Sequence, residues 1–293
     1  MTIASRNFRG LVQPRWDQGF HACVGLDTDF DKIPEKHRIP GSGLSKWAVE
    51  ETVVQYNRSI ITATRDIVAC YKPNRAFYAK HGIPGHYALN RTVGLIRELA
   101  PEIPVIVDGK WGDIGATDEA YRDEALGFGA DAVTLSPYMG EVDSLDRFFA
   151  VEGWGCFVLC MTSSKGSGEI QRMDVSGDMV PGGYMQLYQY VAHRVVDWQT
   201  RSAATLGLVV GATAPQELVE IRKLVGYDMM LLIPGAGKQG GDEAVCARIA
   251  RRNFLINNSS KCIFASEGSD YPDAARSVVL QMNKKIHAGL TAA

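Results

Sequence analysis

Residues 104–117 read PVIVDGKWGDIGAT, an apolar run that stops at a cluster of charged residues and glycines. The run lacks the alternation of apolar and polar residues that a half-exposed strand shows. It therefore predicts a strand covered on both faces, as in parallel sheets. The next segment, residues 117–128, spaces its apolar residues as a helix does. A strand followed by a helix is the repeating unit of α/β folds.

The same unit recurs along the chain. Short apolar runs predict eight strands, near residues 22–27, 67–73, 104–110, 131–137, 155–164, 206–213, 227–237 and 261–266. Helical spacing appears near residues 46–67, 86–99, 117–128, 144–153, 184–205, 215–225, 242–252 and 272–290. This alternation predicts an α/β fold, a single (β/α)8 TIM barrel over residues 1–293 with residues 1–20 as an extra N-terminal segment. A doubly wound open sheet is the structural alternative.

Composition excludes several classes of function. The chain has 293 residues, with 31 Lys and Arg against 33 Asp and Glu, and a formal net charge of -2. This balance does not favour nucleic acid or an anionic membrane as a partner, because both attract basic surfaces. The sequence has no apolar stretch typical of a membrane span or a signal peptide. Its six cysteines form no CxxC pair, so we expect reduced thiols and a cytoplasmic protein.

Charged residues end the third predicted strand. Asp108, Lys110 and Asp113 form a DxKxxD pattern, in which Asp108 and Lys110 point the same way while the chain stays extended. Active sites of TIM barrels lie where the strands end, so we predict that these residues are catalytic. A lysine between carboxylates stays protonated and can serve as an acid. The alternative is a salt bridge in a solvated loop.

A glycine-rich loop follows the seventh predicted strand, in residues 233–252, IPGAGKQGGDEAVCARIARR. Glycines such as Gly235 and Gly240 let backbone N–H groups approach a ligand, and a helix N-terminus favours an anion. The loop therefore predicts a phosphate site, to which Lys261 could add a cation from the other side. The alternative is a flexible turn with Asp242 as the N-cap of the helix.

Together these patterns resemble the orotidine 5'-phosphate decarboxylase family, from about Asp27 to Lys261. DGKWGDIGAT matches the family's DxKxxD core with its following Ile and Thr, and PGAGKQGGD matches its phosphate loop. The resemblance implies decarboxylation of orotidine 5'-phosphate to uridine 5'-phosphate and CO2 in pyrimidine biosynthesis. It also implies a homodimer with shared active sites, no metal and no organic cofactor. HGIPGH, with His81 and His86, lacks the spacing of a metal pair and is interpreted as a loop.

The resemblance assigns roles to single residues. Asp108, Lys110 and Asp113 would form the charged catalytic array, with Asp113 and Thr117 reaching into the neighbouring subunit's site. Ile114 would contact the pyrimidine, and Ser163 would contact its amide edge. Asp27 and Lys72 would hold the ribose hydroxyls. Gln239 would bridge phosphate and pyrimidine, and the backbone near Pro234 and Gly240 would frame these two groups.

Two positions depart from the family pattern. Ser260 and Lys261 stand where the family usually has Ser-Arg or Gly-Arg before the eighth strand, and Trp111 stands where many relatives carry Arg. Lysine lacks the fork with which arginine donates two parallel hydrogen bonds to phosphate. Two other functions remain open. One is another sugar-phosphate decarboxylase, synthase or aldolase on the same scaffold, and the other is a non-enzymatic nucleotide-binding protein.

Overall fold

Eight parallel strands form a barrel in the computed structural model, which describes residues 6–40, 46–236 and 240–292. The strands are hydrogen-bonded in the order β2-β1-β10-β9-β8-β5-β4-β3, and isolated bridges from Tyr71 to Val105 and from Asn74 to Asp108 close the ring between β2 and β3. Their bounds are β1 Ala22–Leu26, β2 Cys70–Pro73, β3 Ile106–Trp111, β4 Ala132–Leu135, β5 Gly155–Met161, β8 Thr205–Val210, β9 Met230–Pro234 and β10 Phe254–Asn258. The predicted TIM barrel is confirmed, and the open sheet is excluded.

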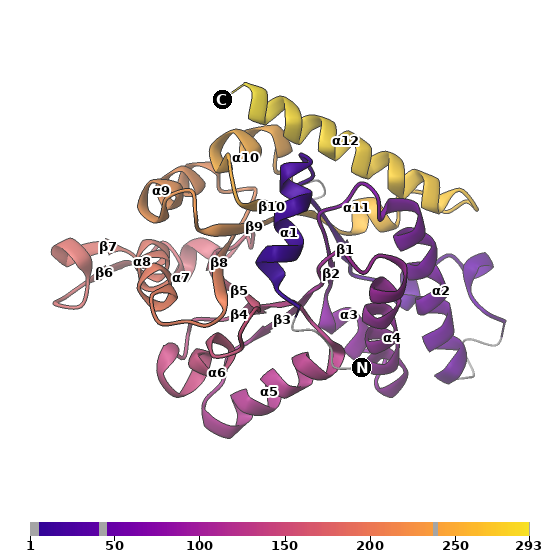
Figure 1. The fold of residues 1–293 in the computed structure, drawn as a ribbon, viewed down its shortest axis with the longest axis horizontal. Coiled ribbons are helices and arrows are strands. Elements are labelled where there is room, and N and C mark those ends of the chain that lie inside the picture. Colours follow the sequence, from indigo (N-terminus) through magenta and orange to yellow (C-terminus); the bar gives the residue numbers. More distant parts are fainter. Residues whose placement is uncertain (1–5, 41–45, 237–239, 293) are drawn as a thin grey trace.

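Helices surround the barrel on its outer side (Figure 1). They are α2 Lys46–Thr64, α3 Arg75–Ala79, α4 Ile83–Leu99, α5 Gly115–Phe128, α6 Asp146–Phe149, α8 Leu187–Gln199, α9 Pro215–Val225, α10 Glu243–Ala250, α11 Ser260–Ile263 and α12 Tyr271–Thr291. Short helical turns occur at η1 Phe30–Lys32, η2 Glu35–His37 and η3 Glu141–Leu145. The main apolar core lies between these helices and the strands. In the described ranges, no helix combines the length and the apolar character needed to cross a membrane.

The eighth strand lies earlier in the chain than predicted. The prediction placed it at residues 261–266, but β10 spans Phe254–Asn258, and Lys261 belongs to the short helix α11. Two polar residues, Asn257 and Asn258, end β10 and are almost fully buried, so this strand does not read as an apolar run. Ile263, which belongs to the apolar run that was predicted to be the strand, is buried in the core as part of α11. Lys261 therefore follows the last strand instead of preceding it.

The N-terminal segment forms helix α1 (Phe8–Asp17), which crosses the middle of the view in Figure 1. Its apolar residues Phe8, Val12 and Trp16 belong to a second core cluster, made with residues inside the barrel. Phe8 packs edge-on against Phe157 of β5, with ring centroids 5.6 Å apart. Because Phe8 also approaches Gly155, the first residue of β5, α1 covers the N-terminal end of the barrel.

An extension that the sequence did not predict joins β5 to α8. It contains α7 (Ser167–Ile170), the strands β6 (Asp174–Ser176) and β7 (Tyr184–Gln186), and the turn η4 (Pro181–Gly183) between them. β6 and β7 pair as an antiparallel hairpin that extends away from the barrel at the left of Figure 1. The extension begins directly after β5, so its first residues lie at the C-terminal rim.

Candidate active site

A cavity of about 360 Å³ opens at the C-terminal rim of the barrel. Every strand of the barrel, or the residue that directly follows it, contributes to its lining. The lining residues on or directly after the strands are Asp27, Lys72, Asn74, Asp108, Lys110, Thr134, Leu159, Thr162, Val209, Leu232, Pro234, Gly235, Asn257, Asn258 and Ser259. A volume in this range suits a small organic ligand, because such sites usually span about 300–1,000 Å³.

Asp108 lies between two lysines at the wall of this cavity. Its Oδ2 accepts a hydrogen bond from Lys72 Nζ at 2.7 Å, and its Oδ1 accepts one from Lys110 Nζ, also at 2.7 Å. Asp27 Oδ1 lies 3.9 Å from Lys72 Nζ on the other side. The side chain of Lys72 is only 4% exposed, whereas that of Lys110 is 48% exposed. Of the two lysines that contact Asp108, Lys110 is therefore the one that a ligand in the cavity can reach more directly.

The charges of this cluster are stabilised by one another. Burial alone would raise the pKa of Asp108, but the positive charges of Lys72 and Lys110 outweigh it and hold that pKa well below its usual range. Burial alone would lower the pKa of Lys72, but Asp108 and Asp27 outweigh it and raise that pKa above its usual value. Asp108 is thus a carboxylate and Lys72 an ammonium at neutral pH.

Lys110 reaches Asp108 through an irregular backbone and not through the extended one that was predicted. Asp108, Gly109 and Lys110 lie between the paired residues Val107 and Trp111, where the register of β3 shifts. Lys110 has φ = 51°, in the left-handed region that residues other than glycine rarely adopt. Both charged side chains line one cavity, but a bulge in the strand, and not an extended chain, brings them together.

Most of the predicted site residues meet in this cavity. Those that line it are Asp27, Lys72, Asp108, Lys110, Ser163, Pro234 and Lys261. In the described part of the chain, Asp113, Ile114, Thr117 and Gly240 do not line it. Gln239 lies outside the described residues. Asp113 and Ile114 follow β3 in the connection to α5, and Ile114 is 56% exposed.

The glycine-rich loop and α11 form one side of the cavity. Gly235 and Ala236 line it from the loop, and Ser260 and Lys261 line it from α11. The first turn of α10 is occupied by its own cap, because the Asp242 carboxylate accepts hydrogen bonds from the N–H groups of Ala244 and Val245. An anion at this side would therefore depend on the loop backbone and on Lys261, and not on those two N–H groups.

Several lining residues were missed by the sequence analysis. They are the polar residues Asn74, Thr134, Thr162, Asn257, Asn258, Ser259 and Ser260. Asn257 and Asn258 were missed because the eighth strand was misplaced. Thr134 and Thr162 each fall at the end of an apolar run, where a polar residue is the signal of a rim position.

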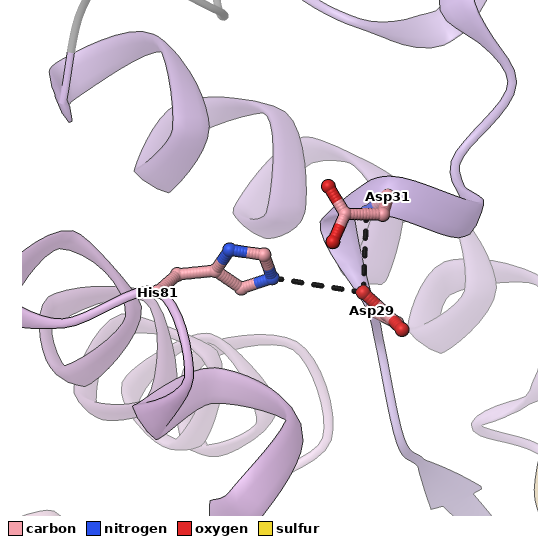
Figure 2. A group of neighbouring side chains, drawn as sticks. All are labelled: Asp29, Asp31 and His81. Carbon is pink, nitrogen blue, oxygen red and sulfur yellow. Dashed lines mark hydrogen bonds and ion pairs between the residues drawn. The ribbon is translucent and has the colours of Figure 1, made fainter.

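A second polar cluster, shown in Figure 2, lies beside the loop that follows β1. Asp29, Asp31 and His81 place ligand atoms within 4.8 Å of one another, as a metal site would require. The ammonium of Lys80 already contacts both carboxylates, at 2.5 Å from Asp29 and 2.9 Å from Asp31. These carboxylates therefore have a protein cation as their partner. Residues 83–86, which the sequence analysis interpreted as part of a loop, belong to α4, so this helix begins before the helical spacing that was predicted from His86.

A comparison with protein families decides the classification. The model described as "Orotidine 5'-phosphate decarboxylase / HUMPS family" matches residues 23–266. The chain belongs to this family. The match begins within β1 and ends after β10, so it includes the C-terminal ends of all the strands that form the cavity.

Individual relatives of the family agree with this classification. The chain is 40% identical over 271 residues to orotidine 5'-phosphate decarboxylase of Ralstonia pickettii, covering 90% of this chain and 92% of that protein. The structure of Leishmania donovani OMP decarboxylase matches with a TM-score of 0.76 and 30% identity, covering 96% of this chain and 100% of that one. Leishmania donovani UMP synthase matches with a TM-score of 0.77 and 31% identity, over 97% of this chain and 57% of that one. The chain thus spans little more than half of that synthase.

The buried charge cluster predicts a pH-dependent loss of stability in Asp108→Asn. The substitution leaves Lys72 buried without its nearest carboxylate, so we expect a loss of about 3 kcal/mol in the free energy of unfolding at pH 7. The folded pKa of Asp108 is depressed, so its contribution is present above the unfolded pKa and is lost as the pH falls. The difference between the two proteins should therefore shrink below about pH 4.

Urea unfolding at pH 7 and at pH 3 measures this difference. Asp123→Asn is the control, because the Asp123 side chain is 64% exposed and pairs with the neighbouring Arg122. We expect it to change stability by less than about 1 kcal/mol at either pH. Equal stability of wild type and Asp108→Asn at pH 7 would contradict the role given to the cluster.

Proposed function

We propose that this protein is a carboxy-lyase that converts orotidine 5'-phosphate to uridine 5'-phosphate and CO2 in de novo pyrimidine biosynthesis, without a metal or an organic cofactor. The observation that carries the proposal is the Lys72–Asp108–Lys110 cluster in a rim cavity of a chain of this family. Its relatives at 40% identity over 271 residues carry that activity in their names.

The cluster suits the charge changes of this reaction. Cleavage of the bond between ring carbon six and the carboxylate releases CO2 and leaves the electron pair on the ring carbon, in the plane of the ring. No neighbouring carbonyl conjugates with that pair, so electrostatic stabilisation must replace an electron sink. Lys110 donates a proton to the carbon and regains one from solvent, and Asp108 lies beside the departing carboxylate.

The other residues predicted from the sequence are proposed to bind the nucleotide. Asp27 and Lys72 hold the ribose hydroxyls, Ser163 contacts the pyrimidine amide edge, and Lys261 meets the phosphate. Support comes from their shared position on one cavity, with Lys261 and the glycine-rich loop on the same side of it. Pro234, Gln239 and Gly240 belong to the same proposal as the frame of phosphate and pyrimidine. Contacts with phosphate lie far from the reacting carbon and supply binding energy for closing the site.

The proposal includes a homodimer that shares its active sites. Asp113 and Thr117 lie on the connection from β3 to α5 and its first turn, outside the cavity of their own chain. Nearby apolar side chains are exposed, with Ile114 at 56% and Val142 at 81%. Exposed apolar groups beside charged residues are typical of an interface. In the proposed dimer, Asp113 and Thr117 complete the partner's site, and Ile114 contacts the pyrimidine.

We also propose a cytoplasmic location. All six cysteines are free and buried in the structure. Free thiols agree with a reducing compartment, where disulfides rarely persist.

Lys110→Ala is predicted to remove turnover and to preserve the fold. The ammonium acts on charge that appears in the transition state, so its loss should lower kcat by far more than about tenfold, or 1.4 kcal/mol in barrier. The loss of orotidine 5'-phosphate absorbance measures kcat, with protein produced in a host that lacks its own decarboxylase. Lys284→Ala, on the exposed side of α12, is the matched control and should behave as wild type.

Two additions to this assay separate the competing functions. A chelator should leave wild-type turnover unchanged, whereas metal-assisted chemistry would lose it. Borohydride with substrate should trap no adduct, whereas an aldolase acting through a Schiff base at Lys110 would be trapped. Lys110→Ala activity within tenfold of wild type would show that Lys110 is not the proton donor.

The shared site is tested by mixing two inactive variants. Lys110→Ala and Asp113→Ala should regain activity after subunit exchange, because each heterodimer assembles one site with both residues intact. Random exchange gives about a quarter of wild-type activity per chain. Absence of recovery after verified exchange would place Asp113 in the site of its own chain or outside the site.

Lys261 is predicted to act on the phosphate. Lys261→Arg should bind orotidine 5'-phosphate as well as wild type or better, because arginine donates two parallel hydrogen bonds. Lys261→Ala should lower kcat/KM for orotidine 5'-phosphate more than for orotidine, which has no phosphate. Equal proportional losses on both substrates would show that Lys261 acts through stability and not as a phosphate ligand.

A further inference from the structure

Thr134 of β4 lies opposite the bulge of β3. Three residues of β3, Asp108 to Lys110, lie between Val107 and Trp111, whereas Thr134 alone lies between their partners Val133 and Leu135 on β4. A bulge takes backbone groups out of the regular ladder between strands. The backbone N–H of Lys110 is one such group, and it needs another acceptor in this largely buried setting.

The hydroxyl of Thr134 connects the two charged residues of the bulge. Its Oγ1 accepts a hydrogen bond from the backbone N–H of Lys110 at 3.0 Å and donates one to Asp108 Oδ1 at 2.8 Å. The same Asp108 Oδ1 accepts the ammonium of Lys110 at 2.7 Å. The Thr134 hydroxyl thus binds both the backbone of Lys110 and the Asp108 carboxylate that accepts the Lys110 ammonium. Thr134 itself is only 2% exposed.

The backbone of Lys110 requires such a support. At φ = 51°, Lys110 adopts a conformation that is unfavourable for a residue with a Cβ. Strained conformations of this kind persist only where the surroundings hold them. Without the Thr134 acceptor, the N–H of Lys110 would lose its bond in the structure, and rotation to an ordinary φ would move the ammonium away from Asp108.

We propose that Thr134 is a positioning residue, which acts through Lys110 and Asp108 and fixes the place of the proton donor. This inference rests on the proposed function, because its main readout is decarboxylation. The ammonium must lie where charge appears on the ring carbon, and small displacements of such a group are costly to rate. Substrate binding depends on other residues, so kcat and KM should respond differently.

Three variants separate the hydroxyl from the methyl group of Thr134. Thr134→Val keeps the shape and loses both hydrogen bonds, whereas Thr134→Ser keeps the hydroxyl and loses the methyl group. Thr134→Ala provides a second comparison with Thr134→Ser, from which it differs by the hydroxyl alone. We expect kcat to fall roughly 10- to 100-fold in Thr134→Val, with KM for orotidine 5'-phosphate within about threefold of wild type. Thr134→Ser should stay within about threefold of wild type in kcat, and well above Thr134→Ala.

Thr52→Val is the matched control. Thr52 is also fully buried, and its Oγ1 also accepts a backbone N–H, that of Ile39 at 3.0 Å. It lies on α2, outside the cavity. We expect Thr52→Val to lower the midpoint of urea unfolding and to leave kcat at the wild-type value. A general effect of losing a buried threonine hydroxyl would instead lower kcat in both proteins.

The outcomes distinguish the two proposals. If wild type decarboxylates orotidine 5'-phosphate and Thr134→Val does so at the same kcat, the positioning role is wrong and the proposed function stands. Equal losses of kcat in Thr134→Ser and Thr134→Ala would also overturn the positioning role, because the methyl group would then be responsible. If Thr134→Val does not fold, the Ser and Ala pair decides the question. An inactive wild type would overturn the proposed function and this inference with it.

Discussion

The carboxylate of Asp108 is the interaction on which the rest of the site depends. It holds the ammonium of Lys72 in a barrel interior that would otherwise disfavour charge, and it holds the half-exposed ammonium of Lys110 at the cavity wall. Lys72 shows the effect most clearly, because burial acts to neutralise it and the neighbouring carboxylates keep it protonated. The electrostatic field at the cavity wall is therefore established by the fold, before any ligand arrives. Such preorganisation is what the proposed reaction requires, because it has no cofactor as an electron sink.

The cavity has two sides of different construction. Its charged side stands on β2, on β3 and on the residue that follows β1. β1 pairs with β2, and Thr134 of β4 holds the bulge of β3. Its other side consists of the loop after β9 and the short helix α11, which have fewer constraints from the sheet. Groups proposed to act on developing charge thus stand mainly on strands, and groups proposed to bind phosphate stand on connecting segments. This division agrees with the usual separation of scaffold and binding loops in TIM barrels.

Much of this arrangement could be predicted from the sequence, because covered parallel strands give apolar runs that end at the rim. Seven strands were placed correctly, and Asp108 and Lys110 were found from their position after such a run. β10 was missed because its last residues are buried asparagines, and the apolar residues of α11 resembled a strand. The pairing of Lys72 with Asp108 joins residues 36 apart in the chain, and no local pattern carries that information. The bulge at Lys110 could not be predicted from the sequence either, because it is defined by the pairing of β3 with β4.

Helix α1 affects how substrate can enter the barrel and how products can leave it. By packing Phe8, Val12 and Trp16 against residues inside the barrel, it closes the end opposite the cavity. In the proposed reaction, the nucleotide, CO2 and water would then all pass through the cavity at the C-terminal rim. CO2 carries no charge for the lysines to retain, whereas the nucleotide keeps its phosphate. The gas is therefore expected to escape first, past a nucleotide that is still bound, and the protein would impose an order of departure on products that are formed together.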